Sequence, residues 1–167
     1  MKIKKVDLDS SDNSKIWNNL VDNYLPDLDE TNRLHMDNVS LTFSLLAVMH
    51  YQIMNGGIVQ FIDNVSGNYF HETLEAAKRI DFTELVNILI KAGEQFPNGI
   101  VPSDWNYRRQ IWDELGEQHT TKGEEYDTEV EEWTNFWEHL DEIYYANENK
   151  LYELTINYLK SNSTVVV

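Results

Sequence analysis

The sequence predicts an all-α protein that folds as a single compact helical domain of about seven to nine helices. Apolar residues recur three and four positions apart along most of the chain, which is the spacing of one face of a helix. Alternation of apolar and polar residues, which would indicate a strand, is not convincing anywhere before the C-terminal tail. A length of 167 residues with 41% hydrophobic residues suits one domain with one core, and it is too apolar for a disordered acidic tail.

The first part of the chain predicts an unstructured start and two helices. Residues 1–12 are polar and aperiodic, so we expect a loose arm ahead of a helical domain that spans residues 13–160. Apolar pairs from Ser14 onward predict an amphipathic helix, and Pro26 stops it. Residues 39–54 are apolar almost all round, which is typical of a central buried helix.

Breaks that contain glycine divide the middle of the chain. Asn55-Gly56-Gly57 is expected to end the central helix, because glycine adopts the left-handed conformation of a helix C-cap at little steric cost. Residues 58–65 then predict a short helix or a turn. Two further helices are expected, one around residues 74–80 and one that Thr83 caps and that runs up to the break at Pro97-Asn98-Gly99.

The last third of the chain predicts three more helices. Pro102 and Ser103 are typical of a helix start, with Ser103 as the N-cap. Apolar positions within residues 129–147 share an arc of about 140° on a helical projection, so this segment predicts an amphipathic helix with a polar outer face. A final helix follows over residues 151–159, and the tail of residues 161–167 is expected to be either frayed or a short edge strand.

The charge of the chain is large and unevenly distributed. Acidic residues number 29 and basic residues 13, which gives a net charge of −16, and residues 110–149 contain thirteen acidic residues against Lys122 alone. This balance disfavours direct binding to nucleic acid or to an anionic membrane, since both attract clustered Lys and Arg. It suits a cationic partner, such as the DNA-binding face of another protein.

The sequence lacks the common signatures of catalysis and cofactor binding. Cysteine is absent, which excludes disulfides, thiolate metal sites and cysteine nucleophiles. None of the five histidines has an acidic residue three positions before it, as the ligand pairs of di-metal carboxylate proteins require. We therefore expect no cofactor, no bound metal and no enzymatic activity. The basic start has no apolar stretch behind it and no uncharged apolar run of about 18 residues follows, so we expect a cytoplasmic location.

Two histidines keep an enzyme open as an alternative. His50 lies on the apolar central helix, and His71-Glu72 imitates the start of a zinc-protease helix without its second histidine. The structural interpretation of His50 is a hydrogen-bonded core histidine, and that of His71 is a polar cluster at a helix N-terminus. The functional hypothesis is a small-molecule hydrolase or metal enzyme that uses carboxylates with His50 or His71.

The acidic stretch itself is the remaining candidate site. Carboxylates one helical turn apart form a row with a spacing of about 6 Å along the axis, and a DNA-binding protein meets such regularly spaced negative charge in phosphates. The structural interpretation of the same residues is a solvated helix face. The candidate partner-binding residues are Asp113, Glu114, Glu117, Glu124, Glu125, Asp127, Glu129, Glu131, Glu132, Glu138, Asp141 and Glu142.

The middle of the chain also resembles a known family. Seven positions match the Asn-Gly-Gly-Phe-x-Gln-Phe-x-x-Asn-x-x-Gly signature of the bacterial DNA-mimic-protein-like domain family, in which Ile58 replaces the usual Phe. They are Asn55, Gly56, Gly57, Gln60, Phe61, Asn64 and Gly67. The signature is a turn-forming core motif, and we expect Gln60 and Asn64 to hydrogen-bond to backbone groups near the Gly-Gly turn.

The resemblance implies a helical fold, a homodimer, and an acidic surface that imitates duplex DNA and occupies the DNA-binding face of a transcription factor. Together with the acidic segment, it makes DNA mimicry the leading hypothesis. A further alternative is an acidic interaction module, similar to an immunity protein or an antitoxin, which has the same charge without the DNA-like spacing. Competition with DNA for the partner would separate these two hypotheses.

Overall fold

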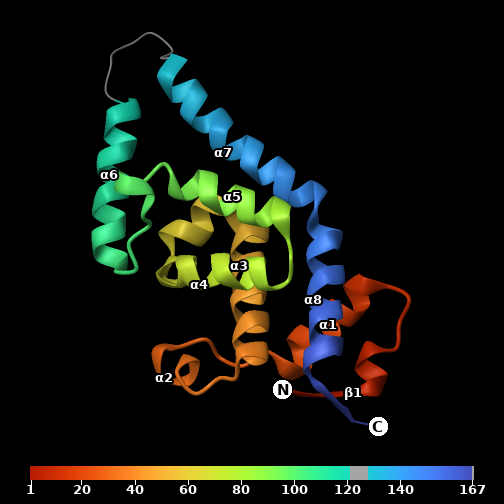
Figure 1. Cartoon of the computed structure of the whole chain (residues 1–167). Coiled ribbons are helices and arrows are strands. Elements are labelled where there is room, and N and C mark those ends of the chain that lie inside the picture. The colour runs from red at the N-terminus through yellow and green to blue at the C-terminus, as the bar shows by residue number, and fades with distance from the viewer. Residues whose placement is uncertain (121–127, 167) are drawn as a thin grey trace.

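Helix α3 lies at the centre of the protein, and the other helices surround it (Figure 1). The computed structural model describes residues 1–120 and 128–166. Its helices are α1 (Asn13–Tyr24), α2 (Glu30–Arg33), α3 (Asn38–Asp63), α4 (Phe70–Arg79), α5 (Thr83–Gly93), α6 (Trp105–Thr120), α7 (Thr128–Ala146) and α8 (Glu148–Asn162). Short 3-10 turns occur at η1 (Lys5–Leu8), η2 (Val65–Tyr69) and η3 (Pro97–Gly99), and two strands at β1 (Lys2–Lys4) and β2 (Thr164–Val166). The predicted all-α class, with eight helices, is confirmed.

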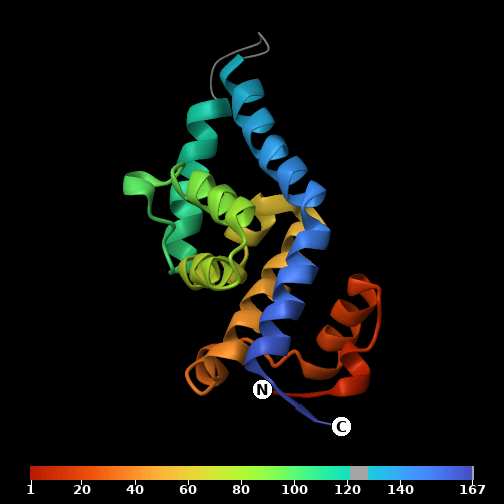
Figure 2. The same ribbon diagram turned by 45° about the vertical axis from the view of Figure 1, so that its right-hand side comes forward.

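The core forms where α3 packs against α4, α7 and α8. Phe43, Leu46, Met49 and Ile53 along α3 have no exposed surface. Figure 2 shows α8 running alongside α3, with α1 beside α8. Within the described residues, α3 is the one helix that is long and apolar enough to cross a membrane. Core helices of globular proteins also meet these two criteria of length and composition. Its burial here identifies it as the core helix that the sequence predicted.

The glycine pair bends α3 and does not end it. Gly57 has φ +76° and ψ −177°, outside the helical region, and the helix resumes at Ile58 and continues to Asp63. The expected helix end and the short helix after it are therefore two segments of one kinked helix. The non-helical dihedral angles of Gly56 and Gly57 interrupt the regular helical pattern at this point, and the backbone N–H of Ile58 donates to a side chain of α7.

The N-terminus is ordered, so the expectation of a loose arm over residues 1–12 is wrong. β1 pairs in parallel with β2, and Ile3 between its two lysines has no exposed surface. The hydroxyl of Tyr24 accepts a hydrogen bond from Lys4 N at 2.9 Å and donates one to Asp7 Oδ2 at 2.5 Å. The tail forms the short edge strand that was one of its two expected states. β1 lacks an apolar pattern because Ile3 is its one buried side chain and the flanking Lys2 and Lys4 are exposed.

Two predicted helix caps are also corrected. α6 is capped by Asp104, whose Oδ1 accepts a hydrogen bond from Tyr107 N at 2.8 Å, and Ser103 lies one residue further out. α5 begins at Thr83 as expected, but its N-cap position is Phe82 and no side chain caps it. Cap positions shift by one residue easily, because Ser, Thr and Asp satisfy the same N–H groups.

Candidate acidic interaction surface

The predicted acidic segment forms a helical arm made of α6 and α7. α6 contacts α7, and α7 also packs on α3 and α5. In Figures 1 and 2 the C-terminal end of α6 and the N-terminal end of α7 extend beyond α5, away from the two chain termini. The arm therefore presents its outer surface to solvent while its base is part of the core.

A cluster of tryptophans holds the two helices of the arm together. The ring of Trp112 on α6 lies 5.8 Å from that of Trp133 and 5.2 Å from that of Trp137 on α7, between ring centroids. Trp133 and Trp137 pack edge to face at 5.5 Å. Phe96 joins Trp112 from the loop after α5, at 5.8 Å. Such aromatic pairs add to area burial, so they fix the relative position of the two acidic helices.

Six predicted carboxylates of the arm lie on its exposed surface. They are Asp113, Glu114, Glu131, Glu132, Glu138 and Glu142. Their contacts are weak: Glu142 lies 3.9 Å from His139 Nδ1, and Glu114 accepts a hydrogen bond from Gln110 at 3.0 Å. Within the described part of the chain, no Lys or Arg forms an ion pair with any of the six. Their negative charge is thus available to a partner.

Five other predicted members of the surface cannot be placed. Glu124, Glu125 and Asp127 lie outside the described residues, and the side chains of Glu117 and Glu129 are likewise outside the described part.

Asp141 has a different role from the one expected of it. Its side chain is half-buried, and its Oδ1 accepts a hydrogen bond from Ile58 N, which directly follows the kink of α3, at 2.7 Å. Burial raises the pKa of Asp141, partly offset by this hydrogen bond, and the nearby charge of Glu138 raises the pKa further. Asp141 follows the buried Trp137 by one helical turn, which places it near the inner edge of α7. It therefore anchors the arm to the core and is not part of the outward row.

The glycine pair of the family signature makes room for this anchor. A Cβ on Gly57 would lie 2.2 Å from Asp141 Oδ2, and the positive φ of Gly57 disfavours any other residue. A Cβ on Gly56 would meet the side-chain oxygen of Gln60. The absence of a side chain at Gly57 thus leaves the space that the carboxylate of Asp141 occupies.

The amides of the signature bond to a different partner from the one predicted. Gln60 and Asn64 both donate to Gln52 Oε1, at 3.0 and 2.7 Å, and so bridge the kink by a side-chain network. Asn55 is exposed and donates to Tyr51 O in its own helix. Phe61 is buried and stacks on Phe70 at 6.0 Å.

Arg108 is a buried residue beside the last glycine of the signature, and sequence reasoning missed it. The side chain is 1% exposed and donates to Ile62 O, Pro102 O and Asn64 O and to Asn68 Oδ1, at 2.6 to 3.0 Å. A Cβ on Gly67 would lie 2.2 Å from Ile62 O and 2.9 Å from the guanidinium carbon of Arg108. Burial lowers the pKa of Arg108. No pattern marks an arginine that pairs with backbone carbonyls, so the sequence offered no signal for it.

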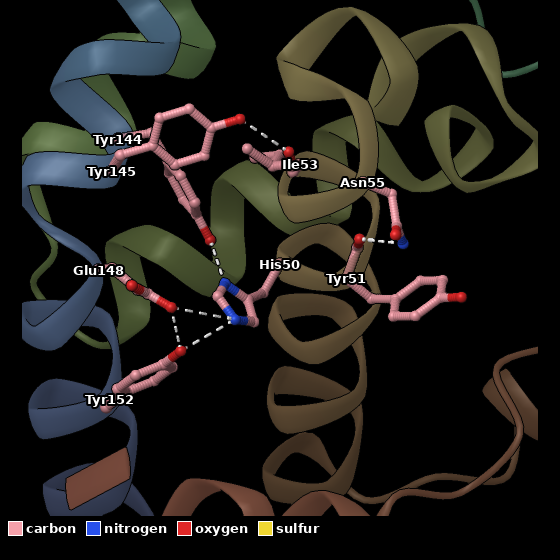
Figure 3. Close-up of polar contacts among 8 residues, drawn as sticks. All are labelled: His50, Tyr51, Ile53, Asn55, Tyr144, Tyr145, Glu148 and Tyr152. Atoms are coloured by element: carbon pink, nitrogen blue, oxygen red, sulfur yellow. Dashed lines mark hydrogen bonds and ion pairs between the residues drawn. The ribbon is translucent and has the colours of Figure 1, made fainter.

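His50 is the centre of a polar cluster at the junction of α7 and α8. Its Nδ1 lies 2.8 Å from the hydroxyl of Tyr144 and its Nε2 3.1 Å from that of Tyr152, which in turn donates to Glu148 (Figure 3). Since Tyr152 gives its proton to Glu148, His50 must donate from Nε2 and accept from Tyr144 at Nδ1. Burial lowers the pKa of His50, an effect partly offset by the charge of Glu148, which lies 3.7 Å from Nε2, and burial raises the pKa of Tyr144. Burial thus favours the neutral form of His50, which is a hydrogen-bonded histidine of the core, as the structural interpretation of the sequence expected.

His71 is exposed, and its Nε2 donates to Val101 O at 3.0 Å. Among the described residues, no three His, Asp or Glu side chains gather closely enough to hold a metal ion. Neither histidine is therefore placed beside a set of acidic groups that could act as metal ligands in this part of the chain.

Comparison with known proteins places this architecture in a family. No curated protein and no solved structure matches the chain. The profile of the DMP19-like protein family matches residues 35–162, which is more than three quarters of the chain. The matched span runs from the start of α3 to the end of α8 and includes the kink, the anchor at Asp141 and both helices of the arm. The chain belongs to the DMP19-like protein family.

Proposed function

We propose that this protein is a DNA mimic that binds the DNA-binding surface of a transcription factor and blocks the access of that factor to DNA. The observation that carries the proposal is the row of exposed carboxylates on the α6–α7 arm, which no Lys or Arg neutralises within the described residues. Membership of a family of DNA mimics supports it. The partner-binding residues are the six exposed acids of the arm, together with the five acids that could not be placed.

The spacing of one stripe on α7 supports the proposal. Glu131, Glu138 and Glu142 lie within about 40° of one another around the helix, because seven residues make nearly two turns and four residues slightly more than one. Their positions along the axis are separated by about 10 Å and about 6 Å. Phosphates of one DNA strand follow each other about every 3.4 Å along the duplex axis, so these separations are close to three and two phosphate steps.

The mechanism is competition and needs no catalytic group. Arg and Lys side chains that release counterions when they bind DNA would pair with the carboxylates of the arm. The Trp112–Trp133–Trp137 cluster and the Asp141 anchor hold these carboxylates in place before the partner arrives, which reduces the entropic cost of binding. Both ring nitrogens of His50 are already engaged by tyrosine hydroxyls, which favours binding over catalysis as the activity of the protein.

The test is a competition experiment with the protein's own partner. A DNA-binding protein recovered from the native cytoplasm by salt elution is bound to its labelled duplex, and release of the duplex is followed by fluorescence anisotropy. We expect the wild-type protein to displace the duplex and the variant E131Q/E138Q/E142Q to do so at least about tenfold less well, because charged pairs at such interfaces contribute strongly to affinity.

The matched control removes the same number of charges elsewhere. Asp22, Glu94 and Glu153 are exposed and lie on α1, at the end of α5 and on α8. The variant D22N/E94Q/E153Q should displace the duplex as the wild-type protein does. Equal displacement by the arm variant would contradict the proposal, and a partner that binds without releasing DNA would favour the acidic interaction module.

A further inference from the structure

A surface groove lies at the foot of the arm, where the N-terminal end of α6 faces α4 and α2. Two cavities of about 440 and about 480 Å³ adjoin there, and both are lined by His71, Ser103 and Asp104. Figure 1 shows α6 starting on the side of the molecule where α2 and α4 lie. The two cavities therefore adjoin at these three residues and are together called the groove, and none of its lining residues belongs to the predicted acidic surface.

One end of the groove is apolar and open to solvent. Ile100 and Tyr107 are each 57% exposed, and both line the first cavity together with Pro97 and Ile111. Large apolar side chains that gather around a hollow are typical of surfaces that bind a partner. This end of the groove can receive an aliphatic or aromatic side chain.

The other end of the groove is acidic. Glu30, Glu72 and Asp104 line the second cavity. Arg33, the one Lys or Arg among the described residues that line the two cavities, donates to Glu72 and lies 5.6 Å from the centre of the Tyr69 ring. Since Glu72 is paired in this way and one oxygen of Asp104 caps α6, the carboxylate of Glu30 and the second oxygen of Asp104 remain to attract a cation.

We propose that this groove binds an extended basic peptide segment whose aliphatic or aromatic side chain enters the apolar end beside Ile100 and Tyr107. The assignment of that segment to the transcription factor rests on the proposed function. DNA-binding proteins commonly carry a basic arm next to the folded domain that contacts DNA. Tyr107 in the groove and Glu114 on the acidic surface are seven residues apart on α6, or about 10 Å along its axis, so one partner can reach both.

A second copy of this chain is a poorer occupant. Each copy carries a net charge of −16, and its basic N-terminal residues Lys2 and Lys4 belong to a strand that is already paired with β2. The groove therefore matches a basic partner better than it matches another molecule of the same protein.

The groove can be tested with synthetic peptides, without knowledge of the natural partner. The first probe is a fluorescein-labelled peptide of alternating Lys and Arg with one central Leu, and the second has Ser in place of that Leu. We expect the Leu peptide to bind about tenfold more tightly in an anisotropy titration, because a buried leucine adds apolar contact that serine lacks. The readout is the ratio of the two affinities, since both peptides share any non-specific attraction to an acidic protein.

Two variants assign this ratio to the groove. The variant I100S/Y107S should bring the ratio close to one, whereas E131Q/E138Q/E142Q should weaken both peptides and keep the ratio. A ratio close to one in the wild-type protein, or a ratio that survives I100S/Y107S, would overturn the proposal. So would a change in the solution mass of the protein in I100S/Y107S, which would indicate that the groove binds a second copy.

A second measurement does not depend on any variant. In the wild-type protein, amide NMR shifts that depend on the Leu of the peptide should centre on residues 98–107, and shifts centred on α7 would contradict the assignment. A failure of the DNA competition experiment would leave these results unaffected. The two proposals can therefore fail separately.

Discussion

At the residue scale, the contact between Asp141 and the kink of α3 is the most informative interaction in the protein. It joins a carboxylate of the acidic segment to the backbone N–H of Ile58, which directly follows the kink at the glycine pair. The sequence presented these two features as unrelated, one as a charge run and one as a turn. In the structure a hydrogen bond between Asp141 and Ile58 N connects the acidic segment to the glycine turn.

Removal of this carboxylate should destabilise the fold, whereas its neutral analogue should be tolerated. Asp141→Ala leaves the N–H of Ile58 without a partner, and we expect the free energy of unfolding to fall by about 1–3 kcal/mol. Asp141→Asn keeps an oxygen that can accept this hydrogen bond. It also removes a carboxyl group whose pKa is raised by burial, so we expect the free energy of unfolding to change by less than about 1 kcal/mol. Urea denaturation measures both variants, and equal losses in the two would contradict the role of the hydrogen bond.

His50 should make the stability of the protein depend on pH. Burial lowers its pKa in the folded state below the ordinary value of 6.5, so the unfolded chain takes up the proton first as the pH falls. The contribution of neutral His50 is fully present above pH 6.5 and is lost as the pH falls from there toward the folded pKa, by at most about 1.4 kcal/mol per pH unit. Protonation also places a hydrogen on Nδ1, where the Tyr144 hydroxyl already donates.

The measurement is the free energy of unfolding between pH 7.5 and pH 5 in the wild type and in His50→Gln. We expect the variant to be less stable at pH 7.5 but to lose less stability on acidification. His139→Gln is the matched control, because it removes an exposed histidine and leaves the cluster around His50 intact. The interpretation would be wrong if the two variants had the same slope.

At the element scale, the sequence predicted the helices well and their ends less well. Periodic apolar residues located every long helix, because burial of one face dominates helical stability in proteins. The glycine pair was interpreted as a stop, and the structure shows a kink, because a partner for the N–H of Ile58 comes from α7, 83 residues further along the chain. Residues 1–12 were interpreted as loose for the same reason: the partner of β1 is the C-terminal strand. Contacts between distant segments leave little trace in local patterns.

The tryptophan cluster should determine how rigidly the acidic arm is held. Trp112→Ala removes ring contacts with Phe96, Trp133 and Trp137, and we expect the free energy of unfolding to fall by about 3 kcal/mol. Because α3 is also packed against α4 and α8, the effect should appear in hydrogen exchange as faster exchange in α6 and α7 with a smaller change in α3. Tyr107→Ala, an exposed aromatic of α6, is the control and should leave exchange in α7 unchanged. Uniformly faster exchange would contradict a separate stabilising role for the cluster.

At the scale of the whole molecule, the sequence predicted where the acidic surface lies, but it did not predict that Asp141 points away from it. Composition alone placed most of the net charge in residues 110–149, and six of those acids are exposed and unpaired with Lys or Arg in the described residues. The helical projection could not separate Asp141 from the outer row, because its position near the boundary of the apolar arc is resolved only by a contact with α3. The groove at the foot of the arm was also not predictable, since its lining residues come from several elements.

We also propose that the protein is a homodimer, and salt should then have opposite effects on its two kinds of association. Operator half-sites lie about 34 Å apart, which two arms of a two-fold dimer span more readily than one. Two chains of net charge −16 repel each other, so screening by salt should strengthen a dimer that an uncharged face holds together. Screening should weaken binding to a basic partner, because carboxylates and cations attract each other there.

Light scattering after size exclusion, at 20 mM and 500 mM sodium chloride, tests this expectation. We expect a mass of about 39 kDa, twice that of one chain, at the higher salt concentration and a lower average mass at the lower one when the protein is dilute. The affinity for the DNA-binding partner should fall over the same range of salt. If the mass stayed at that of one chain throughout, the protein would act as a monomer, and each arm could occupy only a single half-site. A dimer that dissociated as salt was added would place acidic residues of one copy against basic residues of the other, and the outward-facing charge on which the mimicry depends would then be partly consumed within the dimer.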